Sequence, residues 1–406
     1  MVNRRELGTV KTQGAVKRSL PFVCVVSSIA LLAGCGSSSG GGSSSGGGSG
    51  STSADQYVIG QIADLTGGFV QADVPFNTGI TAAVKAINAA GGVNGHKINL
   101  ITLDTAGSTS RAATDLQTLK SAGALIATNM SDSTIFQSLL PAATRDKISL
   151  MGIQPAESEV AQADGYAFEF GLPAAGAIKA MVGSVAAKDK SARIAAVVTA
   201  DPDGQEISKA VENAAKASGL AYAGSVAPAS PSDYGSAAAR IVADKATVVL
   251  TELVGTANTD FMRDLQSAGF PPTNQIIGFA WSAVKPPMPW KNFATLEQYR
   301  ETGDSPAVKA YRDAVTASGT NPDDVMVIDG YAQMQIVKDV LTRCGWPCSL
   351  DKFHETLQNT STDLGGLAFG PVVFTKTNHR GPTAGALRLY DSSGNPAGYA
   401  PPIQGL

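Results

Sequence analysis

Six short segments rich in Ser, Thr, Asp and Gly could contribute polar groups to a binding site, because each follows an apolar run and precedes helical spacing. Hydroxyl groups and the free N–H groups at helix starts suit a carboxylate or another anion. The same residue types are the preferred helix N-caps, so any single segment is better explained by capping. Six such segments together indicate ligand binding more strongly than one does. The segments are DLTGG (64–68), NMSDST (129–134), QPAESE (154–159), TADPDG (199–204), TELVGT (251–256) and FAWSAV (279–284).

The elements between these segments alternate between expected strands and expected helices. YVIGQIA (57–63), KINLITL (97–103) and RIAAVVT (193–199) are β-branched runs typical of buried strands, whereas 77–90 has helical apolar spacing. The alternation predicts an α/β fold with parallel sheets covered on both faces. Two successive series predict two doubly wound, Rossmann-like lobes. Ligands bind beyond the carboxyl ends of the strands in such sheets, which is where the six segments are expected.

Composition and motifs argue against several classes of function. The chain of 406 residues has a net charge of −3, so we expect no nucleic-acid partner. Its three histidines, His96, His354 and His379, lack metal-ligand spacing, and no phosphate-binding GxxxxGK[ST] motif occurs. A GxSxG match at 36–40 lies in a low-complexity stretch rather than between a strand and a helix. We therefore expect no metal, no cofactor and no catalytic residues.

The first 55 residues have the pattern of an export signal followed by a tether. Basic residues precede an uncharged, mostly apolar stretch at 19–34, which is shorter than the about 20 residues of a membrane span. Leu32-Ala33-Gly34-Cys35 resembles the bacterial lipobox, which implies that the Cys35 sulfur receives a diacylglycerol and that cleavage of a signal peptide (1–34) makes Cys35 the new N-terminus. An ordinary signal peptide with a chance cysteine is the alternative. The following Gly/Ser stretch, within 35–55, predicts a flexible tether with a reach of roughly 20–25 Å.

Two further cysteines, Cys344 and Cys348, stand close together in CGWPC. In an exported protein a nearby pair favours a small disulfide loop. A redox CxxC motif has two intervening residues and this pair has three, so a structural bridge is the better interpretation.

The stretch IGQIADLTGGFVQADVPFNTGITAAVKAINAAGGVNGHKINLITLDT (59–105) resembles the opening of type I periplasmic solute-binding proteins of ABC importers. The nearest group is the leucine/isoleucine/valine-binding branch. NMSDST, QPAES and GPVVFTKTNHRG (370–381) fall where that family has corresponding segments. The resemblance covers 56–395 and implies two lobes joined by three crossovers, near 170–175, 284–290 and 381–386. The first lobe is expected at 56–172 plus 286–382 and the second at 173–285 plus 383–406.

The resemblance also implies a ligand site between the lobes. In the first lobe, Ser131 and Ser133 fall where the family has hydroxyl groups that receive the ligand carboxylate. Ala156 falls on a backbone contact, and Ser158 on a hydroxyl that contacts the amino-acid head. The matching first-lobe positions are Thr66, Gly67, Ser131, Asp132, Ser133, Ala156 and Ser158.

The second lobe departs from the family pattern. A family tyrosine aligns with Asp203, and the acidic residue that often receives the ligand ammonium aligns near 280–281, where this chain has Ala-Trp. Glu252 or Asp203 is expected to replace it, and the departures disfavour a branched-chain amino acid. Trp281 and Phe69 are expected to form a stacking wall for an aromatic or larger apolar group. Packing of Trp281 against a hinge is the alternative.

The resemblance implies a monomeric, lipid-anchored solute-binding protein outside the cytoplasm that delivers its ligand to an ABC permease. The expected ligands are an amino acid, an amide, or an aromatic or aliphatic carboxylate. A sensor of the same fold that reports to a signalling partner is the main alternative, and a lipid-anchored hydrolase is a third. Permease and ATPase genes beside the gene would favour the importer, and recovery of an unchanged ligand would count against the hydrolase.

Overall fold

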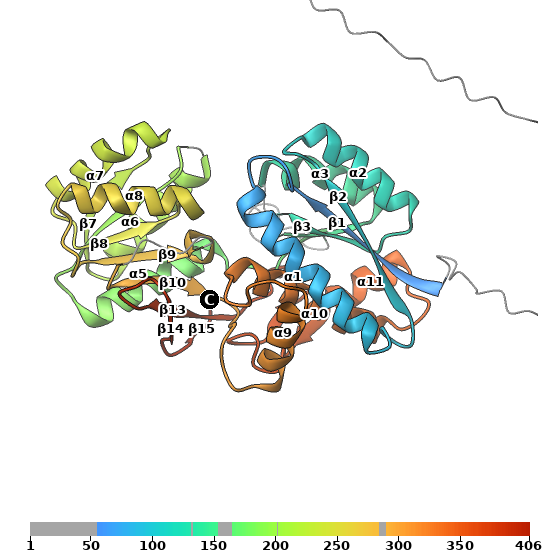
Figure 1. Ribbon diagram of the computed structural model, residues 1–406. Helices are drawn as coiled ribbons and strands as arrows, with labels where there is room; N and C mark the ends of the chain where they lie inside the picture. The colour runs from blue at the N-terminus through green and yellow to red at the C-terminus, as the bar shows by residue number, and fades with distance from the viewer. Residues whose placement is uncertain (1–54, 131–132, 153–164, 201, 284–289) are drawn as a thin grey trace, which may run out of the picture. The chain divides into compact units, whose positions relative to one another are not determined.

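The computed structural model describes residues 55–130, 133–152, 165–200, 202–283 and 290–406. These residues form two large sheets flanked by helices (Figure 1), which confirms the predicted α/β fold with parallel sheets. We call the elements around the five-stranded sheet the first lobe and those around the eight-stranded sheet the second lobe. No helix among the described residues combines the length and the apolar character that crossing a bilayer requires.

The sheet of the first lobe has the order β2-β1-β3-β4-β5, and all of its strand pairs are parallel. Its strands are β1 (Gln56–Ala63), β2 (Lys97–Asp104), β3 (Ile126–Met130), β4 (Ser149–Gly152) and β5 (Ala167–Glu169). The helices of this lobe are α1 (Val70–Ala89), α2 (Thr109–Ser121), α3 (Ser133–Asp146), α9 (Pro306–Ala317), α10 (Val325–Cys344) and α11 (Leu350–Leu357), and a small hairpin is formed by β11 (Thr360–Thr362) and β12 (Val372–Phe374).

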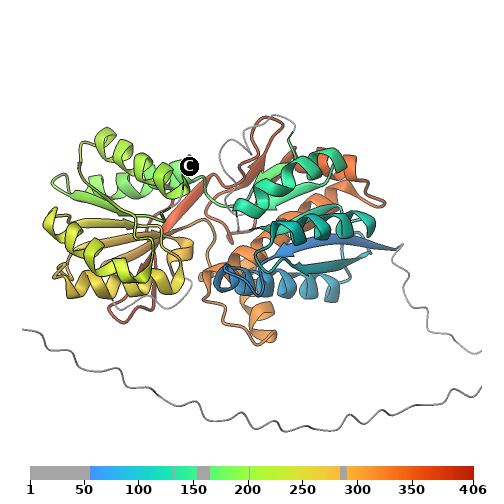
Figure 2. The same cartoon turned by 90° about the horizontal axis from the view of Figure 1, so that it is seen from above.

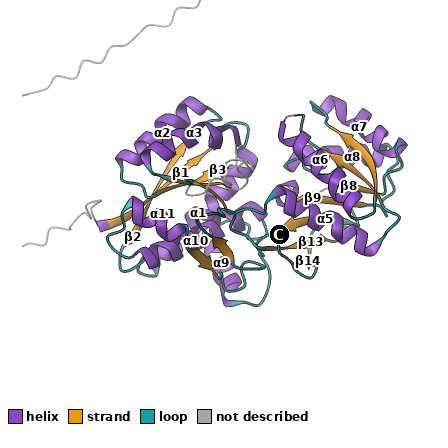
Figure 3. Cartoon of the chain, turned by 180° about the vertical axis from the view of Figure 1, so that it is seen from behind, coloured by secondary structure: helices purple, strands orange, loops and turns teal. Residues whose placement is uncertain are grey.

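Strand β1 is buried on both faces, which explains its continuous apolar sequence. Tyr57 and Ile59 pack in one core with α1 and α10, whereas Val58 and Ile62 pack in a second core with α2 and α3. Helices therefore cover both faces of this sheet (Figures 2 and 3).

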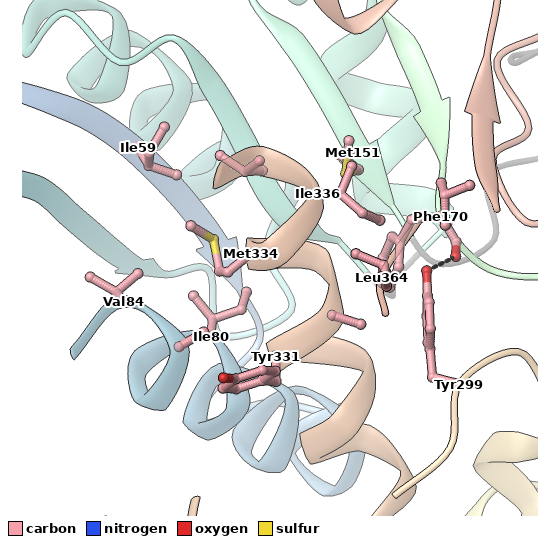
Figure 4. Close-up of a cluster of buried hydrophobic side chains, with 14 of the residues drawn as sticks. Ile59, Ile80, Val84, Met151, Phe170, Tyr299, Tyr331, Met334, Ile336 and Leu364 are labelled. Carbon is pink, nitrogen blue, oxygen red and sulfur yellow. Dashed lines mark hydrogen bonds between the residues drawn. The ribbon is translucent and has the colours of Figure 1, made fainter. Parts of the chain in front are cut away.

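Helices α1 and α10 approach each other closely in the first of these cores. A Cβ atom on Gly79 would lie 2.0 Å from the carbonyl oxygen of Val327, and one on Gly330 would lie 2.1 Å from that of Phe76. Both positions therefore require glycine. Figure 4 shows Ile80 of α1 and Met334 of α10 within this core. The sequence analysis made no prediction for α9, α10 or α11.

The sheet of the second lobe has the order β14-β13-β10-β9-β8-β6-β7, and β15 pairs with β13. Alternate residues of β6 face different cores, so this sheet too is covered on both faces. Its strands are β6 (Arg193–Val197), β7 (Ala221–Val226), β8 (Val248–Thr251), β9 (Gln275–Phe279), β10 (Phe293–Glu297), β13 (Ala384–Tyr390), β14 (Pro396–Tyr399) and β15 (Ile403–Gln404). Its helices are α5 (Ala174–Lys188), α6 (Pro202–Ala217), α7 (Tyr234–Ala243) and α8 (Gly255–Ser267), with short 3₁₀ helices η2 (Pro231–Asp233) and η3 (Ala280–Ala283).

The chain passes between the two sheets three times: after β5, after β10, and between β12 and β13. The second passage follows Glu297, later than the expected 284–290. Strand β10 pairs in parallel with β9 and therefore still belongs to the second sheet. The expected start of the first lobe's second segment at 286 is corrected accordingly.

Cys344 and Cys348 form a disulfide at the end of α10. The loop that it closes contacts the start of β1, because the Tyr57 hydroxyl donates a hydrogen bond to the carbonyl oxygen of Gly345 at 2.8 Å. The ring of Trp346 stacks on that of His96 with a centroid distance of 3.9 Å. The bridge thus holds the beginning of the first sheet against α10.

Replacing both Cys344 and Cys348 by serine is expected to lower the free energy of unfolding by about 2 kcal/mol. The disulfide restricts the unfolded chain, and the effect is modest because the loop that it closes has only five residues. Urea unfolding of residues 54–406 measures this. A variant as stable as the oxidised parent would contradict it. The reduced parent is the matched control and should behave as the serine variant does.

Candidate functional site

The first loop of the first lobe is fixed by two carboxylates. Asp64 is 2% exposed, and its oxygens accept the N–H groups of Gly67 at 2.6 Å and Phe69 at 2.9 Å. Asp104, at the end of the neighbouring β2, accepts the N–H of Leu65 at 2.9 Å and the Thr66 hydroxyl at 2.7 Å. These hydrogen bonds outweigh burial and lower the pKa of Asp104. The carboxylates make the turn between β1 and α1 a rigid structure.

The predicted ligand residues of this loop are therefore already engaged within the protein. The Thr66 hydroxyl and the Gly67 N–H serve the two carboxylates. The side chain of Phe69 is 40% exposed, which leaves its ring available to a ligand or a partner. Sequence reasoning named Thr66 and Gly67 but missed Asp64 and Asp104, although DLTGG and ITLDT contain them.

Ser133 and Asp203 come from different lobes and contact each other. Ser133 begins α3 after β3, and Asp203 lies in the first turn of α6 after β6. The Ser133 hydroxyl donates a hydrogen bond to Asp203 Oδ2 at 3.2 Å. A second cross-lobe contact joins Gln71, in the first turn of α1, to the Thr256 hydroxyl, in the first turn of α8, at 3.3 Å. Segments after the carboxyl ends of strands in both sheets thus meet.

Thr199, Glu252 and Trp281 form a connected set after three adjacent strands, β6, β8 and β9. The Glu252 carboxylate is mostly buried and accepts the Thr199 N–H at 3.1 Å and the Thr199 hydroxyl at 3.3 Å. The Trp281 indole N–H donates to the Glu252 carbonyl oxygen at 2.9 Å. The set combines a carboxylate, a hydroxyl and an aromatic ring, which suit recognition of a polar ligand with an apolar part.

Trp281 is held by packing as well as by its hydrogen bond. Its ring is parallel to that of Phe279, at a centroid distance of 4.5 Å and an interplanar angle of 4°. Asn258 of α8 donates to the Ser282 carbonyl oxygen at 2.9 Å and accepts the Thr251 hydroxyl at 2.9 Å, which fixes the η3 backbone. The ring also packs against the main cores of both lobes. Trp281 therefore has the hinge-packing role that the sequence left open, and it remains only partly buried.

Five predicted positions lie outside the described residues: Ser131, Asp132, Ala156, Ser158 and Cys35. Among the predicted site residues that the structure describes, Ser133 and Asp203 are brought together, as are Glu252 and Trp281. Gln71, Thr199 and Thr256 were missed. Thr199 and Thr256 stand in the loop segments quoted from the sequence, whereas Gln71 had no signal because it precedes the expected start of its helix.

The described residues contain no group of three or more His, Cys, Asp or Glu side chains that could hold a metal ion. His354 and His379 are instead buried in the first lobe. The His354 Nδ1 lies 3.0 Å from the Ser149 hydroxyl, and the His379 Nδ1 lies 2.9 Å from the Ala167 carbonyl oxygen.

Comparison with known proteins gives one family and many similar folds. The model of the periplasmic binding protein family matches residues 56–395. A search of curated proteins finds no significant match. A solved structure of a branched chain amino acid ABC transporter from Thermus thermophilus with bound valine has a TM-score of 0.75 at 15% identity, covering 86% of this chain and 96% of that chain. A solute-binding protein of an ABC transporter from R. palustris in complex with 4-hydroxybenzoate has a TM-score of 0.74 at 16% identity, covering 86% and 98%. A branched-chain amino acid transporter substrate binding protein from Streptococcus pneumoniae in complex with isoleucine has a TM-score of 0.73 at 16% identity, covering 86% and 99%.

Proposed function

Because this chain belongs to the periplasmic binding protein family, whose members bind substrates and are not enzymes, we propose that it captures a small carboxylate or amide ligand between its lobes and delivers it to an ABC importer. The observation that carries this proposal is the meeting of loops from both sheets. Ser133 contacts Asp203, and Gln71 contacts Thr256, all just after the carboxyl ends of strands. A ligand held there would contact both lobes and favour the conformation that brings them together.

Two ends of the site have different chemistry, which suits a ligand with two different ends. The start of α3 offers a helix N-terminus to a carboxylate. The Ser133 hydroxyl there donates to Asp203, so a ligand carboxylate would replace Asp203 as its acceptor. The second lobe offers the Glu252 carboxylate, which accepts hydrogen bonds from Thr199, and the partly exposed ring of Trp281. We assign Glu252 to an ammonium or amide N–H group of the ligand, and Trp281 to its apolar part.

The proposal includes anchoring of the body by lipid on Cys35 through the Gly/Ser tether. Its support is the sequence pattern before and after Cys35. Two or three acyl chains would hold the body at the membrane, at about 0.8 kcal/mol per buried CH₂. Mass spectrometry of the protein extracted from membranes, beside a Cys35→Ser variant, tests this part separately from ligand binding.

A thermal-shift screen of residues 54–406 tests ligand capture. The compounds are amino acids, amides, short peptides, and aromatic and aliphatic carboxylates. A true ligand at 100 times its Kd is expected to stabilise the protein by about 2.7 kcal/mol. No shift with any compound would contradict the proposed ligand class.

Glu252→Gln then tests the assigned roles, with Glu206→Gln on the exposed side of α6 as the matched control. For a ligand with an ammonium group we expect affinity to fall at least about tenfold, because a charge-assisted hydrogen bond is lost. For a carboxylate without an ammonium group we expect little change. Equal loss in both variants, or no loss for an amino-acid ligand, would contradict the role of Glu252.

A further inference from the structure

A second pocket lies on the first lobe, away from the loops that form the candidate site. It has a volume of about 270 Å³ and lies between α9, α10 and the segment 362–367. Its apolar wall comes from Ala307 and Ala310 of α9 and from Leu364 and Leu367. Its polar wall comes mainly from α10. The neighbouring side of α10 packs against α1 in the core, where Tyr331 lies beside Ile80 (Figure 4), so this helix is firmly held.

Three hydrogen-bond donors on one face of α10 line this pocket. Tyr331, Gln335 and Lys338 follow one another at spacings of four and three residues, which places them in one row along the helix. Within the part of the chain that the structure describes, no protein group accepts a hydrogen bond from the Tyr331 hydroxyl, the Gln335 amide or the Lys338 ammonium. Tyr331 is only 5% exposed as a whole residue, and its hydroxyl is the part that reaches the pocket.

The neighbouring polar side chains of the same wall are already paired, which sets these three donors apart. Asp339 Oδ2 accepts a hydrogen bond from Arg343 at 2.8 Å and from the Thr362 hydroxyl at 2.5 Å. Arg343 also donates to the Thr360 hydroxyl at 2.8 Å. This closed network ties α10 to β11 and neutralises the charge of Asp339. Lys338 then contributes a positive charge to the row of free donors, and Asp363, whose Oδ1 accepts the Gly365 N–H at 2.9 Å, contributes a negative charge at the other side of the pocket.

We propose that this pocket is a second binding site, for a small organic carboxylate. The carboxylate would accept hydrogen bonds from Lys338 and Gln335, with Tyr331 donating to the same group or to a neighbouring oxygen. A short aliphatic or aromatic part would lie against Ala307, Ala310, Leu364 and Leu367. The site is separate from the loops between the lobes, so its occupancy does not depend on the proposed transport function.

Titration with benzoate, followed by residue-resolved NMR of isotope-labelled residues 54–406, tests the proposal. We expect benzoate to shift the amide signals of Leu364, Leu367 and the Gln335 region, whereas the uncharged analogue benzamide shifts them much less. Signals near Glu252 and Trp281 report independently on the site between the lobes. The experiment therefore distinguishes a failure of binding in the pocket from a failure of binding between the lobes. Absence of shifts in the pocket at millimolar benzoate would overturn the proposal.

Variants of Lys338 and Tyr331 test which side chains of the pocket contribute to benzoate binding. Lys338→Met is expected to weaken benzoate binding in the pocket by about tenfold, because it removes the charged donor and keeps the length of the side chain. Lys85→Met, on the exposed face of α1, is the matched control and should leave the affinity unchanged. Tyr331→Phe keeps the ring in its packing place and is expected to reduce affinity by a smaller factor. Equal affinity of the parent and Lys338→Met would show that the pocket does not recognise a carboxylate.

Discussion

At about pH 9, where Glu301 has released its proton, replacing Arg388 by methionine is expected to lower the free energy of unfolding by about 3–5 kcal/mol, because it leaves a buried carboxylate without its cation. Arg388 lies on β13 and is 2% exposed. Its guanidinium forms an ion pair with Glu301, donates to the Asp323 carbonyl oxygen at 2.9 Å and to the Tyr390 hydroxyl at 3.2 Å. Glu301 follows β10 in the segment that leaves the second sheet, so the pair ties the second crossover to β13.

Guanidinium chloride unfolding at the same pH measures this loss of stability. Two further variants test whether the loss comes from the buried charge. Arg343→Met removes a partly exposed ion pair with Asp339 and is expected to cost at most about 1 kcal/mol. The double variant Arg388→Met with Glu301→Gln removes both charges of the buried pair, so it is expected to recover a large part of the loss. A single variant as stable as the parent, or a double variant that is less stable than the single one, would contradict the assigned role.

Raising the pH from about 6 to about 8 is expected to lower the free energy of unfolding of the parent by about 1–3 kcal/mol. Three carboxyl groups near the crossover, Glu297, Glu301 and Asp329, are buried, and the guanidinium of Arg388 pairs with Glu301. Burial raises the pKa of all three, to about 8 for Glu301, although Arg388 opposes this at Glu297 and Glu301. The Asp329 carboxyl faces Gln298, whose amide donates to it at 3.1 Å.

Stability falls as the pH rises because the folded state holds more protons than the unfolded state. An unfolded glutamate releases its proton near pH 4.3, whereas the folded Glu301 keeps its proton until about pH 8. The folded state therefore holds more protons between these values. The stabilisation is fully present below the lower value and is lost as the pH rises through the upper one.

Urea unfolding at several pH values measures the slope. Glu301→Gln should have a flatter dependence than the parent, because glutamine does not titrate. Glu355→Gln on the exposed face of α11 is the matched control and should keep the slope of the parent. Stability that rises with pH over the same range would contradict the prediction.

The alternation of apolar runs and helical spacing was sufficient to predict the fold class and strands such as β1, β2 and β6, whereas β5 had no prediction. Parallel strands covered on both faces have a strong local signal, since most positions of β1 and β6 are apolar. The elements after residue 290 had no prediction, and β10 came after the expected crossover. Their assignment depends on pairing between distant segments, as when β10 pairs with β9 on one side and with β13 on the other. The sequence of a strand does not indicate which distant strand it pairs with.

For the candidate site, sequence by itself determined which loops carry polar residues, because the carboxyl ends of parallel strands lie at one edge of a sheet. It named Ser133, Asp203, Glu252 and Trp281, whose positions after strands follow from that rule. Only the tertiary structure decided which polar groups remain available. The Thr66 hydroxyl donates a hydrogen bond to Asp104, and the Gly67 N–H donates one to Asp64. The Glu252 carboxylate accepts a hydrogen bond from the Thr199 N–H, which orients it. The physical reason is that a hydrogen bond joins atoms a few ångströms apart in space, whatever their separation along the chain.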